Sequence, residues 1–281
     1  MPASVLADEP IYTMGGERVN RFDLYEWCVQ SCQVQVRFLD AVHGGMPQVL
    51  ADDFAGPAGL ARAWLDLGAE RGAIATDIDE EPLAHGLIRA IERHGESALR
   101  RLALQRCGVL EAGGQADVVA ALNFAAGELP TRPVLVTYMR HVLFRLNAGG
   151  VLVLDTYGGP DAFTQGVYEV DVAISGETVR YEWHQRECDP LTSRVRNAIH
   201  FSIPGGPRIE DAFTYDWRLW SVGELRDAML EAGFRATEVY LDYSGALDDD
   251  GQLLVAPDSI DGEFVDRTLD GDFVAYVVGR V

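Results

Sequence analysis

The chain has 281 residues, of which 48% are hydrophobic, which is enough material for one large domain or a domain with an insertion. Its formal net charge is −21, and all 23 of its basic residues are arginine. A field of that sign repels phosphate backbones, so DNA and RNA are disfavoured as partners. The absence of lysine excludes Schiff-base chemistry on a side-chain amine.

The chain shows no pattern typical of a membrane span or an export signal. No apolar run approaches the ~20 residues that cross a bilayer, and the N-terminus lacks a charged segment followed by an apolar one. We therefore expect a cytoplasmic protein with no membrane partner. The four cysteines form no CxxC pair and have no metal-ligand spacing with histidine, so we expect reduced thiols and no metal site.

Residues 1–45 predict a helical cap ahead of the first strand of the core. Residues 1–20 have no regular pattern, and Gly15-Gly16 would act as a hinge. Asn20 or Asp23 can cap a helix through FDLYEWCVQ, and a second amphipathic stretch covers residues 34–42.

Residues 48–79 form one strand, loop, helix and strand unit. A buried strand (48–51) leads into Asp52 and Asp53 and a small-residue turn, an apolar-periodic helix covers 60–67, and a second strand (73–76) ends in Asp77. This layout suits a nucleoside. Small residues let a ligand approach the backbone, helix N-terminal amides point at it, and the final acid can accept from both ribose hydroxyls.

The turn in this unit distinguishes two classes of cofactor. A dinucleotide site needs Gly-x-Gly-x-x-Gly for a pyrophosphate, whereas here only Gly56 and Gly59 follow two carboxylates that would repel it. The segment ADDFAGPAG, with ATDID after it, resembles the first two motifs of class I S-adenosylmethionine-dependent methyltransferases, in a variant of the commoner Asp-x-Gly-x-Gly-x-Gly pattern. The alternative is a generic α/β crossover without a nucleoside.

The resemblance implies S-adenosylmethionine as cofactor and S-adenosylhomocysteine as product. Asp77 would hold the ribose hydroxyls, and Asp53 would help frame the methionine amine. The cap would bring two aromatic residues near the methionine end of the cofactor, Tyr25 as a catalytic candidate and Trp27 as a substrate contact, unless both are core. The matched positions give these expected cofactor contacts: Asp53, Ala55, Gly56, Gly59, Asp77, Ile78, Gly108, Val109 and Asn123.

Helices and strands continue to alternate after Asp77. A helix begins after Asp79, with His85 and His94 expected at its surface or end, and a third strand covers 102–106. Cys107 follows, where the resembled family has an acid that reads adenine. A fourth apolar run (117–124) suits a strand buried on both faces, with Asn123 at the carboxyl edge. Its LNFAAGE lacks the Asn/Asp-Pro-Pro-Tyr/Phe motif of DNA amino methyltransferases.

A helix over 131–146 and a strand over 151–155 precede Tyr157, an aromatic candidate for the active site at the same sheet edge. From residue 168 to 215 the pattern alternates, which predicts an antiparallel meander inserted after the fifth strand. One face is apolar, and the other carries arginine and histidine. That polar face is either solvated or lines the substrate pocket, with His184 as a base and His200 beside the substrate.

The last part of the chain returns to the core. Trp217, Arg218 and Trp220 lie where the insertion rejoins the domain, so they either cap the pocket, with Trp217 and Arg218 as substrate contacts, or serve packing. Ser221 opens a helix as a capping box. A sixth strand (236–243), an acidic loop (248–262) and a last strand (272–280), antiparallel beside the sixth, complete the chain.

These elements predict an α/β fold, a Rossmann-like seven-stranded class I methyltransferase sheet with helices on both faces and an inserted antiparallel β meander. We expect a cap at 1–45, a cofactor domain at 46–160 and 215–281, and a substrate or lid region at 161–214. The implied reaction is methyl transfer to a nitrogen or oxygen of a small-molecule acceptor. An NAD-linked enzyme, another transferase on this scaffold and a non-catalytic cofactor sensor stay open, and a homodimer is compatible with the sequence.

Overall fold

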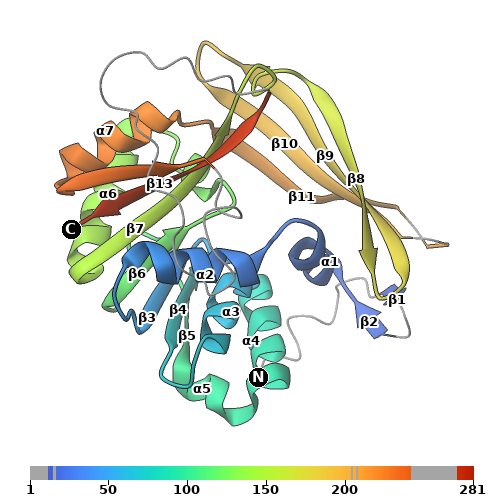
Figure 1. The fold of residues 1–281 in the computed structure, drawn as a ribbon. Helices are drawn as coiled ribbons and strands as arrows, with labels where there is room; N and C mark the ends of the chain where they lie inside the picture. The colour runs from blue at the N-terminus through green and yellow to red at the C-terminus, as the bar shows by residue number, and fades with distance from the viewer. Residues whose placement is uncertain (1–11, 15–16, 204, 207, 242–270) are drawn as a thin grey trace.

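A seven-stranded sheet forms the centre of the protein (Figure 1). The structure, a computed structural model, describes residues 12–14, 17–203, 205–206, 208–241 and 271–281. The strand order is β12-β13-β7-β6-β3-β4-β5, and β13 is antiparallel to both of its neighbours. The strands are β3 (Val49–Asp53), β4 (Gly72–Asp77), β5 (Leu102–Arg106), β6 (Ala116–Ala121), β7 (Leu146–Gly158), β12 (Ala236–Tyr240) and β13 (Phe273–Arg280).

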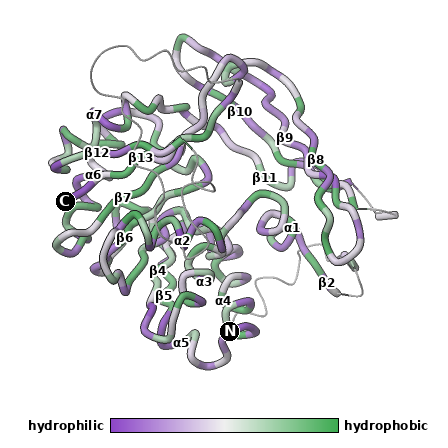
Figure 2. The backbone as a smooth tube through the Cα atoms, in the orientation of Figure 1, coloured by the Kyte–Doolittle hydropathy of each residue, from purple (hydrophilic) through white to green (hydrophobic). Residues whose placement is uncertain are grey.

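Helices cover both faces of this sheet and make two separate cores. On one face α2 (Cys32–His43), α3 (Gly59–Asp66) and α4 (Glu80–His94) pack on the sheet, followed by η2 (Gly95–Ser97) and α5 (Ala98–Arg101). On the other face lie α6 (Arg132–Arg145) and α7 (Val222–Ala232). The central strands contain apolar runs because both faces of the sheet are buried, and Figure 2 shows hydrophobic stretches along them.

A second, four-stranded antiparallel sheet is inserted between β7 and α7 and arches over the carboxyl ends of the parallel strands (Figure 1). Its order is β11-β10-β9-β8, with β8 (Gly166–Ile174), β9 (Glu177–Asp189), β10 (Arg194–Ser202) and β11 (Arg208–Arg218). Alternate side chains of β9 and β10 face the domain, among them Tyr181, Ile199 and Phe201. The meander predicted from the alternating sequence pattern is therefore present.

The N-terminal segment is more regular than its sequence pattern indicates. We expected residues 1–20 to be irregular, but Tyr12–Met14 (β1) and Glu17–Val19 (β2) pair as antiparallel strands. The two residues between these strands lie outside those described. Helix α1 (Arg21–Cys28) begins with a capping box in which Asn20 accepts from the amides of Phe22 and Asp23. The apolar side of α1 packs beneath the inserted sheet.

A buried polar cluster joins α1 to α4. Asp23, 4% exposed, accepts two hydrogen bonds from Arg89 and lies 3.2 Å from Nε2 of His85. The other ring nitrogen of His85 lies 3.2 Å from the side-chain amide of Asn20. The expected surface position of His85 is thus wrong, because the ring is 4% exposed and helps to fix the cap.

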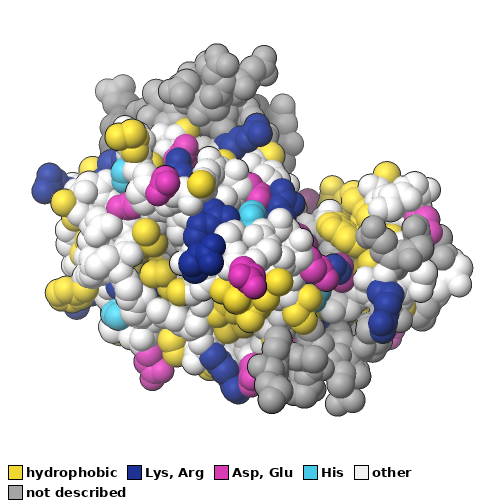
Figure 3. Space-filling view, turned by 90° about the horizontal axis from the view of Figure 1, so that it is seen from below, with side chains coloured by type: hydrophobic (Ala, Val, Ile, Leu, Met, Phe, Trp, Pro, Cys, Tyr) yellow, Lys and Arg dark blue, Asp and Glu magenta, His cyan; other side chains and the backbone are white. Residues whose placement is uncertain are grey.

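The final elements agree with the expected order. Ser221 and Glu224 form the capping box of α7, and β12 pairs with β13 in antiparallel register. The acidic loop 248–262 and the end of the expected sixth strand lie outside the described residues. No helix among the described residues is long and apolar enough to span a bilayer. Seen from the side of α5, the surface carries arginines interspersed with acids and small apolar patches (Figure 3).

The polar cluster between α1 and α4 generates a pH-dependent prediction. Burial alone raises the pKa of Asp23, but hydrogen bonds from His85 and Asn20 and the nearby positive groups outweigh it and hold the pKa below its ordinary 3.8. The ionised carboxylate therefore adds stability above pH 4, and this is lost as the pH falls through the lowered pKa. We expect Asp23→Asn to lower the free energy of unfolding at pH 7 by about 1 to 3 kcal/mol in urea titrations.

Glu92→Gln is the matched control, because Glu92 pairs with the same Arg89 from an exposed position and should contribute less than about 0.5 kcal/mol. The difference in the free energy of unfolding between Asp23→Asn and wild type should narrow as the pH falls below 4. A difference that widens on acidification would contradict this account.

Candidate active site

The loop between β3 and α3 holds an unusual backbone at the carboxyl edge of the sheet. Phe54, Gly56 and Ala58 all have positive φ angles, of 59°, 52° and 55°. Such a conformation costs energy in residues that carry a Cβ and concentrates at functional sites. Helix α4 supports the loop closely, because a Cβ on Gly86 would lie 2.3 Å from the carbonyl oxygen of Pro57. A side chain at position 86 would therefore displace the loop.

Asp77 stands at the end of β4 and faces this loop. Its carboxylate accepts hydrogen bonds from the amides of Gly56 (2.7 Å) and Asp79 (3.0 Å). Burial raises the pKa of Asp77, and these two amide hydrogen bonds oppose the shift. The side chain of Ile78, next in sequence, is 70% exposed. An acid and an apolar side chain thus lie together beside a loop of small residues.

The two consecutive aspartates at the end of β3 point to opposite faces of the sheet, which overturns the role expected for Asp53. Asp53, 1% exposed, accepts from both terminal nitrogens of Arg145 at 2.7 and 3.0 Å and from the hydroxyl of Tyr138 at 2.9 Å. Both of its oxygens are therefore engaged inside the core formed with α6. Asp53 is not free to contact a ligand.

Asp52, and not Asp53, faces the loop before α3. One of its oxygens accepts from the amide of Ala61 in the first turn of α3, and among the described residues it has no ion pair. Burial raises the pKa of Asp52 to about 8, helped by the neighbouring charges of Asp53 and Asp77. The sequence carries a signal for this, because side chains alternate along a strand and only one of two adjacent acids can face the loop.

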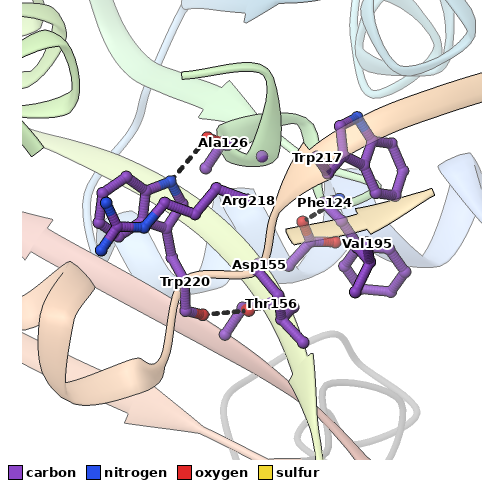
Figure 4. A pocket seen from close by; sticks show the side chains of 10 residues that line it. Phe124, Ala126, Asp155, Thr156, Val195, Trp217, Arg218 and Trp220 are labelled. Atoms are coloured by element: carbon purple, nitrogen blue, oxygen red, sulfur yellow. Dashed lines mark hydrogen bonds between the residues drawn. The ribbon is translucent and has the colours of Figure 1, made fainter. Parts of the chain in front are cut away.

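The loops after β5 and β6 complete the edge. Gly108 borders open space, whereas the side chain of Val109 is buried. Asn123 and Phe124 both have positive φ, and their amides donate to the carboxylate of Asp155 at 2.9 and 2.7 Å. Figure 4 shows the bond from Phe124. Burial raises the pKa of Asp155 to about 7. Sequence analysis missed this role, although Asp155 ends an apolar strand at the same edge.

An aromatic cluster lies between this edge and the inner face of the inserted sheet. Tyr157 contacts Phe124 and Trp183, with ring centroids 4.9 and 6.5 Å apart, and its hydroxyl donates to Gln185 at 3.1 Å. Tyr215 and Trp217 continue the cluster along β11, with centroids 4.2 Å apart. Tyr25 of α1 interacts with Tyr215, and burial raises its pKa to about 12. The structure therefore brings three expected residues together, namely Tyr25, Tyr157 and Trp217.

Glu128 is a candidate that sequence analysis missed. It ends the short helix η3 (Ala125–Glu128) after β6, and its carboxylate accepts from the indole nitrogen of Trp217 at 2.7 Å. The tryptophan ring lies against the backbone of this helix, since a Cβ on Gly127 would be 2.7 Å from it. Burial raises the pKa of Glu128, and the hydrogen bond from Trp217 opposes this. An isolated acid following LNFAAG at the sheet edge is the signal that could have identified it.

Four other expected site residues lie elsewhere. His184 and His200 point to the outer face of the inserted sheet, where their rings contact one another and His200 accepts from the amide of Asp211. This favours a structural over a catalytic role for both. Trp27 is 36% exposed and borders an outer groove between α1, α3 and β8. Arg218 binds Glu224 and covers the ring of Trp220, pointing away from Phe124 (Figure 4).

The remaining residues that we expected at the site lie in packed positions. Gly59 lies under the connection between α1 and α2, where a Cβ would be 2.7 Å from the side chain of Gln30. Ala55 is buried in the loop, and its amide donates to the carbonyl of Thr76. Trp220 serves packing, with its indole bonded to the carbonyls of Ala126 and Leu129. The described residues contain no group of three or more His, Cys, Asp or Glu suited to a metal ion.

Comparison with solved structures identifies the fold. No family model and no curated protein sequence matches the chain. The chain is similar to the CcbJ methyltransferase from Streptomyces caelestis, with a TM-score of 0.65, 16% identity, and coverage of 92% of this chain and 94% of that one. It is also similar to an S-adenosylmethionine-dependent methyltransferase from Clostridium acetobutylicum, with a TM-score of 0.63, 13% identity, and coverage of 92% of this chain and 96% of that one. The protein therefore has the class I methyltransferase fold.

A third neighbour comes from Micromonospora echinaspora. CalS10, described as an amino pentose methyltransferase with bound S-adenosylmethionine, has a TM-score of 0.59 and 16% identity over 92% of this chain and 95% of that one. All three similarities cover the inserted sheet as well as the core, because they span at least 92% of this chain. The expected seven-stranded fold with its antiparallel insertion is thus confirmed.

The different surroundings of Asp52 and Asp53 predict that their substitution has opposite effects on the free energy of unfolding. The pKa of Asp52 is raised to about 8, so ionising it in the folded protein costs free energy from about pH 4 upward. We expect Asp52→Asn to raise the free energy of unfolding of the ligand-free protein at pH 8 by at least ~1 kcal/mol. Asp53→Asn should lower it by about 3 to 5 kcal/mol, because it leaves Arg145 buried without its partner.

Thermal and urea unfolding at pH 8 measure both effects. Tyr138→Phe is the matched control for Asp53→Asn, since it removes one hydrogen bond to Asp53 and leaves the ion pair intact. If Asp52→Asn and Asp53→Asn change the free energy of unfolding by equal amounts in the same direction, the proposed difference between the two carboxylates is wrong.

Proposed function

We propose that this protein is an S-adenosylmethionine-dependent methyltransferase that transfers a methyl group to a nitrogen or oxygen of a small-molecule acceptor. The observation that carries the proposal is the pair of acids at one sheet edge, Asp52 and Asp77. Both have raised pKa values, and neither forms an ion pair with a described residue. Buried carboxylates without a cationic partner suit a ligand that brings positive charge and hydrogen-bond donors.

The residues of this edge fit the three parts of S-adenosylmethionine. Asp77 would accept from the ribose hydroxyls, and Asp52 would face the ammonium of the methionine part. The side chain of Ile78 is 70% exposed, and it would contact the adenine ring. Gly56 and Gly108 border open space on either side of Asp77, which would let the nucleoside lie against the backbone.

When bound, S-adenosylmethionine supplies an electrophilic methyl group on a sulfonium, which is displaced by a lone pair of the acceptor and leaves S-adenosylhomocysteine. The protein's contribution is alignment and exclusion of water. Helix α1 and the inserted sheet cover the carboxyl edge, so the aromatic cluster would form the acceptor side of the site. Tyr25 and Tyr157 keep their protons at neutral pH, because burial raises both pKa values to about 12, and they can orient an acceptor by hydrogen bonding.

The solved structures of this fold support a small acceptor. CalS10 acts on an amino pentose, and CcbJ is a methyltransferase, and each matches this chain along nearly its whole length. Because these similarities include the inserted sheet, we propose a small-molecule acceptor for this chain as well. A cytoplasmic protein of this kind would need no partner macromolecule.

Calorimetric titration with S-adenosylhomocysteine tests the proposal. We expect micromolar binding to the wild type, weakened about ten- to hundredfold in Asp77→Ala, because a charged hydrogen-bond acceptor contributes ~1.5 to 3 kcal/mol. Asp52→Asn should also weaken binding although it stabilises the free protein. Asp117→Asn is the control, since Asp117 binds backbone amides at the opposite end of β3 and should leave the affinity unchanged.

The rival functions give different results in the same experiment. Heat with NAD and none with S-adenosylhomocysteine would indicate an oxidoreductase and refute the proposal. Tight cofactor binding with no methylated product, across panels of amines, alcohols and carboxylic acids analysed by mass spectrometry, would indicate a sensor. A product heavier by more than one methyl group would indicate transfer of another group.

A further inference from the structure

The inner face of the inserted sheet is aromatic, and the one guanidinium that lies against its rings in the described part of the chain is Arg21 of α1, 5.4 Å from Phe213 and paired with Glu81. Trp183 and Trp217 have ring centroids 6.0 Å apart, Tyr215 lies 4.2 Å from Trp217 and 6.2 Å from Trp183, and Phe124 approaches Trp217 from the sheet edge at 6.2 Å. Only Trp217 of these four is fully buried. The other three are partly exposed where the inserted sheet faces the core. The rings thus offer π faces to a molecule that enters between the two sheets.

Five arginines within the strands of the inserted sheet lie on the other face and are paired there. These pairs are Arg180 with Asp171, Arg186 with Asp211, Arg194 with Asp216, Arg196 with Glu187 and Asp216, and Arg208 with Glu182. Arg218, at the end of β11, binds Glu224. A phosphate or carboxylate needs arginine, lysine or clustered amides as donors, so the inner face lacks what an anionic ligand requires.

A carboxylate lies beside the aromatic cluster, whereas Arg218, which lines the same small cavity as Phe124 and Trp217, is paired with Glu224. The carboxylate of Glu128 is held at the edge of the Trp217 ring by the indole hydrogen bond, and Asp77 lies near enough to influence the titration of Glu128. Asn197, 2% exposed, faces the cluster from β10, where its side chain interacts with Tyr157. The cluster therefore combines π faces, a carboxylate and a neutral polar group.

We infer that the acceptor is an organic amine that binds as its ammonium ion and has apolar flanks, and that Glu128 with Trp183, Tyr215 and Trp217 selects it. Before methyl transfer the ammonium gives its proton to the carboxylate of Glu128, which frees the nitrogen lone pair. A cation over aromatic faces is attracted by the ring quadrupole, and this attraction strengthens when water is excluded. Glu128 supplies the opposite charge at one side of the rings. Phosphorylated and carboxylated acceptors are excluded by the same field.

The inference rests on the proposed function in calling this ligand the acceptor, but cation binding is measurable without turnover. The probe is benzyltrimethylammonium, which has a permanent charge, an apolar flank and no nitrogen lone pair to be methylated. Benzoate and benzyl alcohol serve as anionic and neutral comparisons. Each is titrated calorimetrically into the full-length protein with and without saturating S-adenosylhomocysteine.

We expect the cation to bind at least tenfold more tightly than either comparison, and its affinity to fall as NaCl rises from 50 to 500 mM. Glu128→Gln should weaken cation binding at least fivefold, since the amide oxygen can still accept from Trp217 while the charge is gone. Trp183→Leu should weaken it by removing a π face. Glu187→Gln, on the outer face, is the matched control and should bind the cation as wild type does.

Three results would overturn the inference: benzoate binding as tightly as the cation, no binding of any probe, or cation binding that is unchanged in Glu128→Gln. Failure of the proposed function looks different. In that case S-adenosylhomocysteine does not bind, while the order of affinities for the three probes is still measured on the protein alone.

Discussion

The buried ion pair between Asp53 and Arg145 is the interaction on which the candidate site depends. It places a charge inside the core on the α6 side of the sheet and satisfies it with a guanidinium and a phenol. Because side chains alternate along a strand, fixing Asp53 on that side turns Asp52 toward the loop before α3. Two identical residues thereby acquire different chemistry, one serving the fold and the other facing the ligand side. Asp52 is buried without an ion-pair partner among the described residues, and this burial raises its pKa.

Carboxylates also shape the backbone of the site. Asp77 binds the amide of Gly56, and Asp155 binds the amides of Asn123 and Phe124. In both places the chain adopts positive φ angles that it would otherwise avoid. These acids therefore hold strained loops in position before any ligand arrives. The strongly acidic composition of the protein has a structural use here, in addition to its effect on the surface field.

The sequence predicted the framework because the framework follows from local rules. Apolar runs buried on both faces, glycines after helices and the capping box at Ser221 indicate their elements without knowledge of distant contacts. Alternation in β9 and β10 likewise predicted which residues share a face. The site was predicted less well because its residues depend on register between distant segments. The pairing of Asp53 with Arg145 and of Glu128 with Trp217 joins residues 92 and 89 positions apart.

The inserted sheet leaves and re-enters the core at neighbouring points. Thr156, near the end of β7, donates its hydroxyl to the carbonyl of Trp220 at 2.6 Å, so the two ends of the insertion are held together by the core itself (Figure 4). The segment between these residues therefore leaves the core and returns to it at one place. The inserted sheet also packs on the core away from this point, because Trp217 bonds to Glu128 and the inner face of the sheet lies against α1. The strands that carry Asp52 and Asp77 precede the insertion in sequence, so this sheet edge is built without any residue of the inserted sheet.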